Sequence, residues 1–182
     1  MPTPRDQPLL VVVTGPPAAG KTTIAREIAA SLRLPLIAKD TIKEALFDTL
    51  GTGGLAWSQR LGVATYLAIV ALLEESIAAG ASVVVEANFV RESEVETRLA
   101  ALPARFVQMY CGAPLEVLLE RYAKRERHPG HVDAERIDAL QEAVESSRHH
   151  PLELPGETIR LDTSKPVAIG DVLARVGLSP RS

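Results

Sequence analysis

The sequence is poor in cysteine and has no surplus of positive charge. Cys111 is the only cysteine among 182 residues, which excludes an intramolecular disulfide and suits a reducing compartment, and we expect it to be a buried thiol at a strand end. The chain carries 20 Lys and Arg against 23 Asp and Glu, and its formal net charge is −3. It therefore lacks the basic footprint of proteins that bind phosphate backbones, and nucleic acid is a less favoured partner.

Long apolar runs and targeting signals are also scarce. The longest apolar run, Val63 to Leu73, is interrupted by Thr65 and is shorter than the ~20 residues that cross a bilayer, so it predicts a buried helix and no membrane partner. Residues 1–8 contain one basic residue and no apolar segment, unlike a secretory signal. With 46% hydrophobic and 24% charged residues, the composition is that of a globular protein. We expect one cytoplasmic domain over residues 1–182, as a monomer or homodimer.

Short apolar runs alternate with longer segments of helical period, a pattern typical of parallel strands joined by crossover helices. One amphipathic helix is expected around Ile24 to Leu32, and a long one from about Ser58 to Ala79, which Gly80 would end. Thr41-x-x-Glu44 and Ser93-x-x-Glu96 match the capping box and predict helix starts after the second and third strands. The sequence thus predicts an α/β fold with helices on both faces of a five-stranded parallel sheet, whose strands are Leu9–Val13, Leu36–Ala38, Ser82–Val85, Arg105–Tyr110 and Thr158–Leu161.

A phosphate-binding motif follows the first expected strand. The segment Gly15-Pro16-Pro17-Ala18-Ala19-Gly20-Lys21-Thr22 fits G-x-x-x-x-G-K-[ST], the P-loop or Walker A pattern. Its place between a strand and a helix lets backbone N–H groups and the helix N-terminus surround a polyphosphate. Lys21 would reach the β- and γ-phosphates, Thr22 would offer its hydroxyl to Mg²⁺, and Thr23 would join the nucleotide-binding residues. The motif predicts ATP and Mg²⁺ as cofactors.

P-loops serve GTPases, oligomeric ATPases and small-molecule kinases, so other residues must decide between them. No Asn/Thr-Lys-x-Asp motif that reads guanine occurs in the sequence, and the chain is too short for the extra subdomain of an oligomeric ATPase. Asp40 follows the second strand and precedes the expected N-cap Thr41, so it should face the crevice at the carboxyl edge of the sheet. An ionised carboxylate there could accept the proton of an acceptor hydroxyl, or it could merely cap a helix.

With Lys21, Thr22 and Asp40, the chain resembles the P-loop kinases that include polynucleotide 5′-kinases, chloramphenicol phosphotransferase, gluconate kinase and zeta-toxin kinases. The resemblance implies a P-loop NTPase fold with a helical lid, a general base at Asp40 and a substrate contact at Lys43. Glu86-Ala87-Asn88 is similar to the acidic-x-Asn end of the family's third strand, where Asp is commoner. Glu86 would then hold a Mg²⁺-bound water and, with Asn88, lie at the substrate; alternatively, Glu86 is a buried acid bonded to the P-loop backbone.

The resemblance also assigns a lid to residues 121–133 and an adenine-binding loop to Asp162–Pro166, with Thr163 as the nucleotide contact. Arg121 and Arg125 match the family's Arg-x-x-x-Arg spacing on the helix after the fourth strand, share a helix face, and would close over the transferring phosphoryl group. Arg127 is a further candidate. The alternatives are solvated arginines paired with Glu120 or Glu126, and an ordinary strand-to-helix turn at Asp162–Pro166.

Several residues near these motifs keep more than one interpretation. His128 and His131 surround a Pro-Gly turn and could contact substrate, where we place His128, or bind zinc, or only shape the turn. Arg91 is assigned to the acceptor pocket, to which Arg60 and Trp57 could also belong, although Trp57 could equally pack in the core. His149 and His150 are expected as a surface cap at a helix end.

The favoured function is an ATP-dependent kinase that phosphorylates a hydroxyl of a small molecule such as a nucleoside, a sugar or an antibiotic-like compound. Two alternatives remain. One is a polynucleotide 5′-hydroxyl kinase, which the resemblance favours and the acidic charge balance does not. The other is a nucleotide-binding regulatory module that transfers no phosphate.

Overall fold

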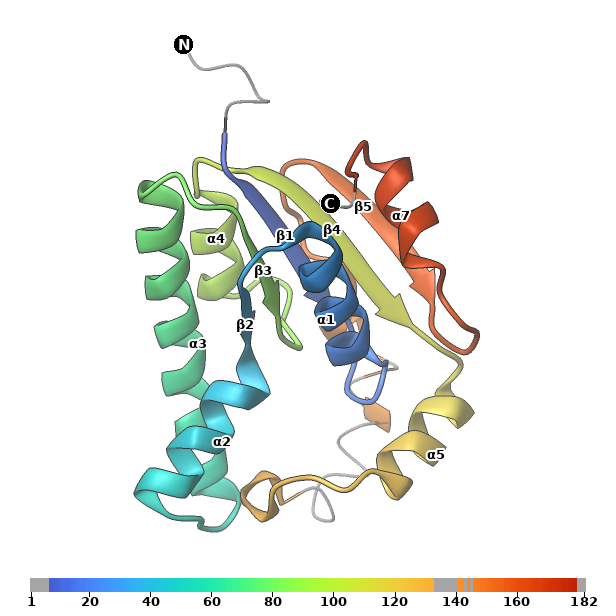
Figure 1. Ribbon diagram of the computed structural model, residues 1–182. Coiled ribbons are helices and arrows are strands. Elements are labelled where there is room, and N and C mark those ends of the chain that lie inside the picture. The colour runs from blue at the N-terminus through green and yellow to red at the C-terminus, as the bar shows by residue number, and fades with distance from the viewer. Residues whose placement is uncertain (1–6, 133–140, 143, 145, 180–182) are drawn as a thin grey trace.

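The five strands of the computed structural model form one parallel sheet in the order β2-β3-β1-β4-β5. The structure describes residues 7–132, 141, 142, 144 and 146–179 (Figure 1). The predicted five-stranded parallel sheet is confirmed, with each end of a strand within two residues of its expected place. The strands are β1 (Leu9–Thr14), β2 (Leu36–Ala38), β3 (Val83–Glu86), β4 (Arg105–Gly112) and β5 (Glu157–Asp162).

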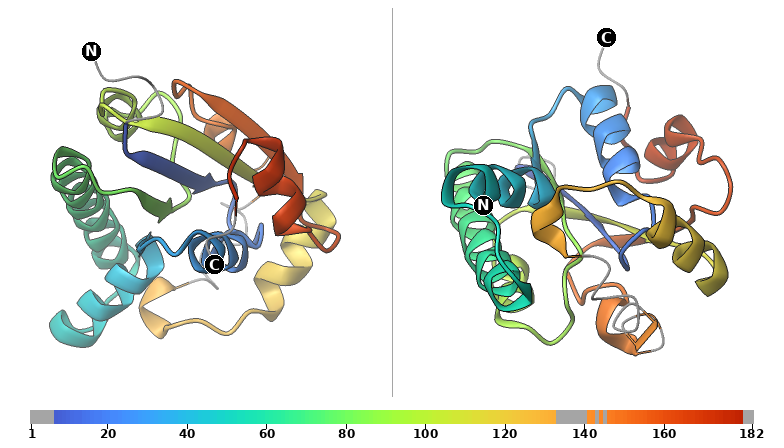
Figure 2. Two further views of the ribbon diagram at one scale, coloured as in Figure 1. Left: turned by 45° about the horizontal axis from the view of Figure 1, so that its top comes forward. Right: turned by 90° about the horizontal axis from the view of Figure 1, so that it is seen from below.

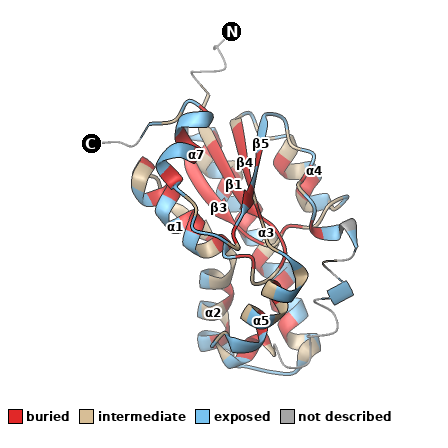
Figure 3. Ribbon diagram, turned by 90° about the vertical axis from the view of Figure 1, so that its right-hand side faces the viewer, coloured by how far each residue is buried: buried red, intermediate tan, exposed pale blue. Residues whose placement is uncertain are grey.

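Helices cover both faces of the sheet, which is why β1 and β3 are continuous apolar runs rather than alternating ones. Val11 and Val13 pack in a core with α1 (Lys21–Leu32) and α7 (Ile169–Arg175), whereas Leu10 and Val12 pack in a second core with α3 (Leu55–Ala78) and α4 (Glu94–Ala100). The views in Figure 2 show α1 and α7 on the opposite side of the sheet from α3 and α4, and Figure 3 shows the buried strands between them.

The start of α2 (Lys39–Leu50) differs from the prediction. Its N-cap is Ala38, in extended conformation, and no side chain caps it, so the expected capping role of Thr41 is wrong. The reason is that β2 passes directly into the helix, which begins three residues earlier than expected. Asp40 consequently lies in the first turn of α2 instead of before it. The second predicted helix start is confirmed, because the Ser93 hydroxyl accepts a hydrogen bond from the backbone N–H of Glu96, although the Glu96 carboxylate accepts from the N–H of Glu92 instead of that of Ser93.

Helix α3 is longer and more exposed than the sequence suggested. It ends as predicted at Gly80, whose left-handed conformation allows Ala81 N–H to donate to Ser76 O and Gly80 N–H to Ile77 O. The run Val63 to Leu73 is not fully buried as expected, since Val63, Leu67 and Leu72 are exposed. Among the described residues, α3 is the one helix long and apolar enough to cross a membrane, although its opposite face packs in the protein core.

The chain beyond β4 forms α5 (Leu115–Lys124), an irregular segment and the short helix η1 (Pro129–His131). Helix α5 ends at Lys124, and Arg125 is already extended. We call residues 125–132 the lid segment; Asp133, the last residue of the expected lid, lies outside the described residues. Gly130 packs against α2 so closely that a Cβ atom on it would lie 2.6 Å from the Phe47 ring. After the undescribed stretch, η3 (Ser147–His149) leads towards β5.

The P-loop leaves β1 through a close approach to β4. Gly15 has a φ of 137°, and a Cβ atom on it would lie 2.1 Å from the carbonyl oxygen of Cys111. Only glycine fits this position. Cys111 is fully buried near the end of β4, as predicted, and burial raises the pKa of its thiol to about 12.

His149 is buried, so its predicted role as a surface cap is wrong. Its Nδ1 lies 3.1 Å from the carbonyl oxygen of Phe89, and because a carbonyl only accepts, Nδ1 carries the proton. Burial lowers the pKa of His149 to about 4. The imidazole is therefore neutral at neutral pH and links the segment before β5 to the loop after β3.

We predict that His149 makes the fold acid-sensitive. The unfolded chain binds a proton at His149 below its ordinary pKa of 6.5, whereas the folded chain does so only near 4, so stability is lost as pH falls through this window. The loss amounts to about 3 kcal/mol. In urea unfolding between about pH 7 and pH 4, His149→Asn should lose less stability than wild type, and His150→Asn should match wild type. Parallel pH profiles for wild type and His149→Asn would contradict the prediction.

Candidate active site

A cavity of about 1130 Å³ opens at the carboxyl edge of the sheet. Its walls come from the P-loop, α2, α3, the end of β3, the end of α5 and the lid segment. In Figure 1 these elements surround the lower end of the sheet, which is where ligands bind in open α/β folds. The cavity brings together most of the residues that the sequence nominated, from six separate parts of the chain.

The P-loop forms one wall. Pro17, Ala18, Gly20 and Thr23 line the cavity, while Gly15, Pro16 and Ala19 lie buried beneath them. Ala18 and Gly20 have φ angles of 62° and 73°, a winding that wraps the loop around the start of α1. The N-terminal N–H groups of α1 have no partners within the helix and are suited to phosphate oxygens.

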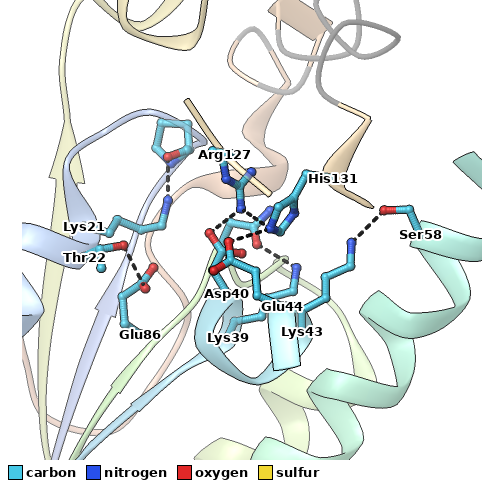
Figure 4. Close-up of polar contacts among 12 residues, drawn as sticks. Lys21, Thr22, Lys39, Asp40, Lys43, Glu44, Ser58, Glu86, Arg127 and His131 are labelled. Atoms are coloured by element: carbon cyan, nitrogen blue, oxygen red, sulfur yellow. Dashed lines mark hydrogen bonds and ion pairs between the residues drawn. The ribbon is translucent and has the colours of Figure 1, made fainter. Parts of the chain in front are cut away.

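Lys21 and Thr22 begin α1 and extend towards the cavity (Figure 4). Lys21 is buried and donates to the carbonyl oxygen of Pro16 at 2.7 Å. Burial lowers the pKa of Lys21, although the charge of Glu86 opposes this shift. Thr22 donates its hydroxyl proton to Glu86 Oε2 at 3.1 Å.

Glu86, the last residue of β3, is 3% exposed. Burial raises its pKa, and Lys21 and the Thr22 hydrogen bond counteract that effect. The carboxylate and the Thr22 hydroxyl supply oxygen donors beside the P-loop, as a hard cation such as Mg²⁺ requires. The described contact of Glu86 is with a side chain of the P-loop. This one position is compatible with both interpretations of Glu86, as a ligand of a metal-bound water and as a support for the P-loop.

Asp40 projects from the first turn of α2 and forms an ion pair with Arg127 of the lid segment. Burial would raise the pKa of Asp40, but Arg127 and then His131 outweigh burial, so the pKa lies below its ordinary value. Asp40 is thus ionised, and its partner is the arginine that the sequence ranked behind Arg121 and Arg125.

His131 links the lid segment to α2 a second time. Its Nε2 lies 3.0 Å from Nη2 of Arg127 and 2.9 Å from Oε1 of Glu44, so this nitrogen either accepts from Arg127 or donates to Glu44. Burial, reinforced by the charge of Arg127, lowers the pKa of His131. The neutral imidazole sits between a cation and an anion, and the cavity lies beside it.

The wall opposite the P-loop is built from α2, α3 and the loop after β3. Lys43 is buried and donates to the Ser58 hydroxyl at 2.9 Å. Lys39 donates to Asn88 Oδ1 at 2.9 Å and lies over the Tyr66 ring. Tyr66 in turn donates to the carbonyl oxygen of Asn88 at 2.7 Å. Lys43 and Asn88, which the sequence nominated as substrate contacts, therefore both line the cavity.

The two predicted lid arginines line the cavity but do not share a helix face, since α5 ends between them. Arg121 donates to the carbonyl oxygen of Thr163 at 2.8 Å, and Arg125 lies 3.9 Å from the Tyr122 ring centre. Thr163 is buried beside Gly20, and Asp162 Oδ1 accepts from the Ser164 N–H in a local turn. The loop is thus a turn that also braces Arg121.

Of three further residues that the sequence nominated for the acceptor side, only Arg91 lines the cavity. His128 stacks on Phe47, contacts Asp48 and does not line the cavity. Trp57 is neither among the residues that line the cavity nor in the core. Its indole N–H donates to Gly51 O, and Arg60 lies over its ring. Arg91 does line the cavity, where it pairs with Glu153.

Sequence reasoning missed the polar stripe of α3. Ser58, Gly62 and Tyr66 recur every four residues along α3, and all three line the cavity. That spacing puts them on one helix face and could have marked them. Lys39, Ser146, Arg148 and His149 also line the cavity. Among the described residues no group of three or more His, Cys, Asp and Glu could hold a metal ion, which gives the zinc interpretation of His128 and His131 no support.

Comparison with known proteins identifies the family. Residues 10–147, from β1 through the lid segment, match the protein family described as "AAA domain". The chain belongs to this family. Solved structures that share this fold include a putative kinase, a gluconokinase and a shikimate kinase, and the P-loop kinase resemblance drawn from Lys21, Thr22 and Asp40 is confirmed.

Individual relatives agree with this assignment. The chain is 35% identical to a "putative kinase" from Chloroflexus aurantiacus, whose crystal structure superposes with a TM-score of 0.84 over 94% of this chain and 97% of that one. It is 31% identical to a "probable adenylyl-sulfate kinase" from Pyrococcus abyssi over 62% of its own length, and spans 64% of that relative. Shikimate kinase from Bacteroides thetaiotaomicron, 17% identical, shares the fold with a TM-score of 0.58 over 94% and 99% of the two chains.

We predict that Arg127 sets the titration of Asp40. Arg127→Gln removes the largest of the charges that oppose the effect of burial on the pKa of Asp40, so the carboxyl should titrate at higher pH than in wild type. Carbon NMR of the Asp40 carboxyl across an acid titration measures this directly. Arg60→Gln, an exposed arginine outside the cavity, is the control. A titration unchanged by Arg127→Gln would rule out the ion pair as the cause.

Proposed function

We propose that the protein is a cytoplasmic, ATP-dependent phosphotransferase that moves the γ-phosphate of ATP to a hydroxyl of a small molecule. Its single domain would span residues 1–182. The observation that carries the proposal is the ionised Asp40 in the same cavity as the P-loop Lys21 and the Thr22–Glu86 pair. A regulatory module that only binds nucleotide needs no base across from its phosphate site.

The nucleotide side of the cavity would hold ATP and Mg²⁺. The P-loop N–H groups and Lys21 bind the phosphates, and Arg121 and Arg125 face them from the end of α5. Thr22 would hold Mg²⁺ directly and Glu86 through a water; the cation supplies charge neutralisation on the phosphates. Thr163, which anchors Arg121, places the adenine loop next to Gly20.

The acceptor side would orient and deprotonate the hydroxyl. Asp40, kept ionised by Arg127, accepts the hydroxyl proton as the oxygen forms its bond to phosphorus, and the bond from phosphorus to the leaving ADP oxygen breaks. The ion pair with Arg127 also restrains the Asp40 carboxylate. Lys43 and Asn88 contact the remainder of the acceptor, with Arg91 at its outer end.

We predict that substitutions of Asp40 and of Lys21 affect ATP binding and phosphate transfer differently. Asp40→Asn should bind ATP nearly as wild type and transfer phosphate about 10²–10⁴-fold more slowly, the usual contribution of a general base. Lys21→Ala should lose both ATP affinity and turnover, because it removes a charge contact to the phosphates. Calorimetry gives the affinity and ADP release the rate. Normal transfer by Asp40→Asn would support the regulatory module instead.

The salt dependence of acceptor affinity distinguishes a small acceptor from a polynucleotide. A polynucleotide 5′-kinase contacts several phosphates and releases counterions, so its acceptor affinity should fall about 10³-fold between ~50 and ~200 mM salt. We predict a far smaller loss for the true acceptor of this acidic chain. A 5′-hydroxyl oligonucleotide is compared with nucleosides, sugars and antibiotic-like alcohols in one salt series. Efficient, steeply salt-dependent phosphorylation of the oligonucleotide alone would replace the small-molecule assignment.

A further inference from the structure

We propose that the protein forms a twofold-symmetric dimer in which the exposed face of α3 packs antiparallel against the same face of a second copy. The inference goes beyond the proposed function and does not depend on it, because neither the contact nor its test involves phosphate transfer. It concerns the side of α3 that is turned away from the protein core.

The first observation is that this side of α3 is apolar without interruption. Between Arg60 and Glu75 all six exposed residues are apolar, and we call them the outer face of α3: Val63, Ala64, Leu67, Ala68, Ala71 and Leu72. Val63, Leu67 and Leu72 are 62%, 47% and 48% exposed. Single exposed apolar residues are normal, but a continuous group of them marks an interaction surface.

The second observation is the spacing of these residues, which is that of a helix-to-helix contact. Ala64 and Ala71 lie seven residues apart with Leu67 between them, so the three residues follow one another along a single seam of the helix. The small alanines let a second helix approach closely, and Leu67 can insert between the side chains of that helix. In Figure 1 and in the left view of Figure 2, α3 lies at one edge of the molecule, where a second copy can reach it.

The third observation is the pair of opposite charges that bounds the outer face. Arg60 and Glu75 are both exposed, and they lie equally far from the midpoint of the face between Leu67 and Ala68. In an antiparallel dimer Arg60 of each copy therefore meets Glu75 of the other copy, once at each end. A parallel dimer would bring like charges together instead. Exposed ion pairs add little affinity, but charge complementarity of this kind determines how two surfaces orient.

The charges also distinguish a second copy from a membrane. Helix α3 is long and apolar enough to cross a bilayer, yet its other side packs in the protein core. A helix that lies on a membrane surface carries Lys and Arg along its polar edges. The outer face has a basic residue at one end only and the acidic Glu75 at the other. That arrangement is complementary to itself, which a twofold contact requires because both copies use the same surface.

Sedimentation velocity of the whole chain from ~1 to ~200 μM tests for the dimer. We expect a dissociation constant on the order of 10 μM, because one helix from each copy gives an interface at the small end, below about 1,200 Å² of buried surface. Leu67→Glu places a carboxylate near the twofold axis in both copies and should weaken the dimer at least about tenfold. Leu50→Glu is the matched control, since Leu50 is an equally exposed leucine at the end of α2, and it should leave the dimer unchanged.

Charge reversal tests the antiparallel orientation. Arg60→Glu and Glu75→Arg each place like charges at both ends of the contact and should weaken the dimer by roughly threefold to tenfold. The double variant exchanges the two charges and should restore wild-type affinity. None of the three substituted residues lines the cavity, and circular dichroism shows whether each variant is folded.

Sedimentation as a monomer throughout the concentration range would overturn the dimer. A dimer that tolerates Leu67→Glu would overturn the outer face as its interface, and a double variant as weak as the single ones would overturn the antiparallel arrangement. Flotation with phosphatidylcholine–phosphatidylserine vesicles supplies the remaining comparison. Vesicle binding by a monomeric protein, abolished by Leu67→Glu, would assign the outer face to a membrane instead. Failure to phosphorylate any acceptor would count against the proposed function alone.

Discussion

Parallel pairing of β1 with its two neighbours determines where the chemistry of this protein can occur. The register aligns Val13 with Glu86 and Thr14 with Tyr110, so β1, β3 and β4 end at one edge of the sheet. The P-loop must then leave β1 between its neighbours, and the chain passes Cys111 at a distance that only Gly15 allows. Glu86 is brought to the start of α1 by the same register, which is how a residue 64 positions from Thr22 comes to share a hydrogen bond with it.

Charged side chains of opposite sign lie near one another around the cavity, and each affects the pKa of its neighbour. Burial lowers the pKa of Lys21 and raises the pKa of Glu86, and in each case the charge of the other residue opposes the shift. Asp40 depends in the same way on Arg127. These pairs hold charged groups in partly desolvated positions that single residues could not occupy without changing protonation state. The nucleotide side and the acceptor side each contain one such pair.

The sequence predicted those features of the fold that depend on interactions between residues close together in the chain. The P-loop match located the residues from Gly15 to Thr22, and the apolar runs located the five strands, because strand pattern and loop spacing are encoded over a few residues. Arg127 was ranked behind Arg125 because the Arg-x-x-x-Arg spacing presumes a continuing helix. The helix ends at Lys124, and the lid segment is instead held by contacts with α2 more than 80 positions away. The burial of His149 and the exposed face of α3 likewise depend on packing between distant elements.

The enclosed position of Cys111 has a practical consequence. Its thiol is buried against the P-loop backbone and, with a pKa of about 12, offers almost no thiolate to a reagent at neutral pH. It is also the chain's only cysteine. A cysteine engineered on the lid segment or on α3 would therefore take up a maleimide fluorophore alone, in the otherwise unaltered protein. Changes in the surroundings of that fluorophore could then be followed during turnover without first removing the native sulfur.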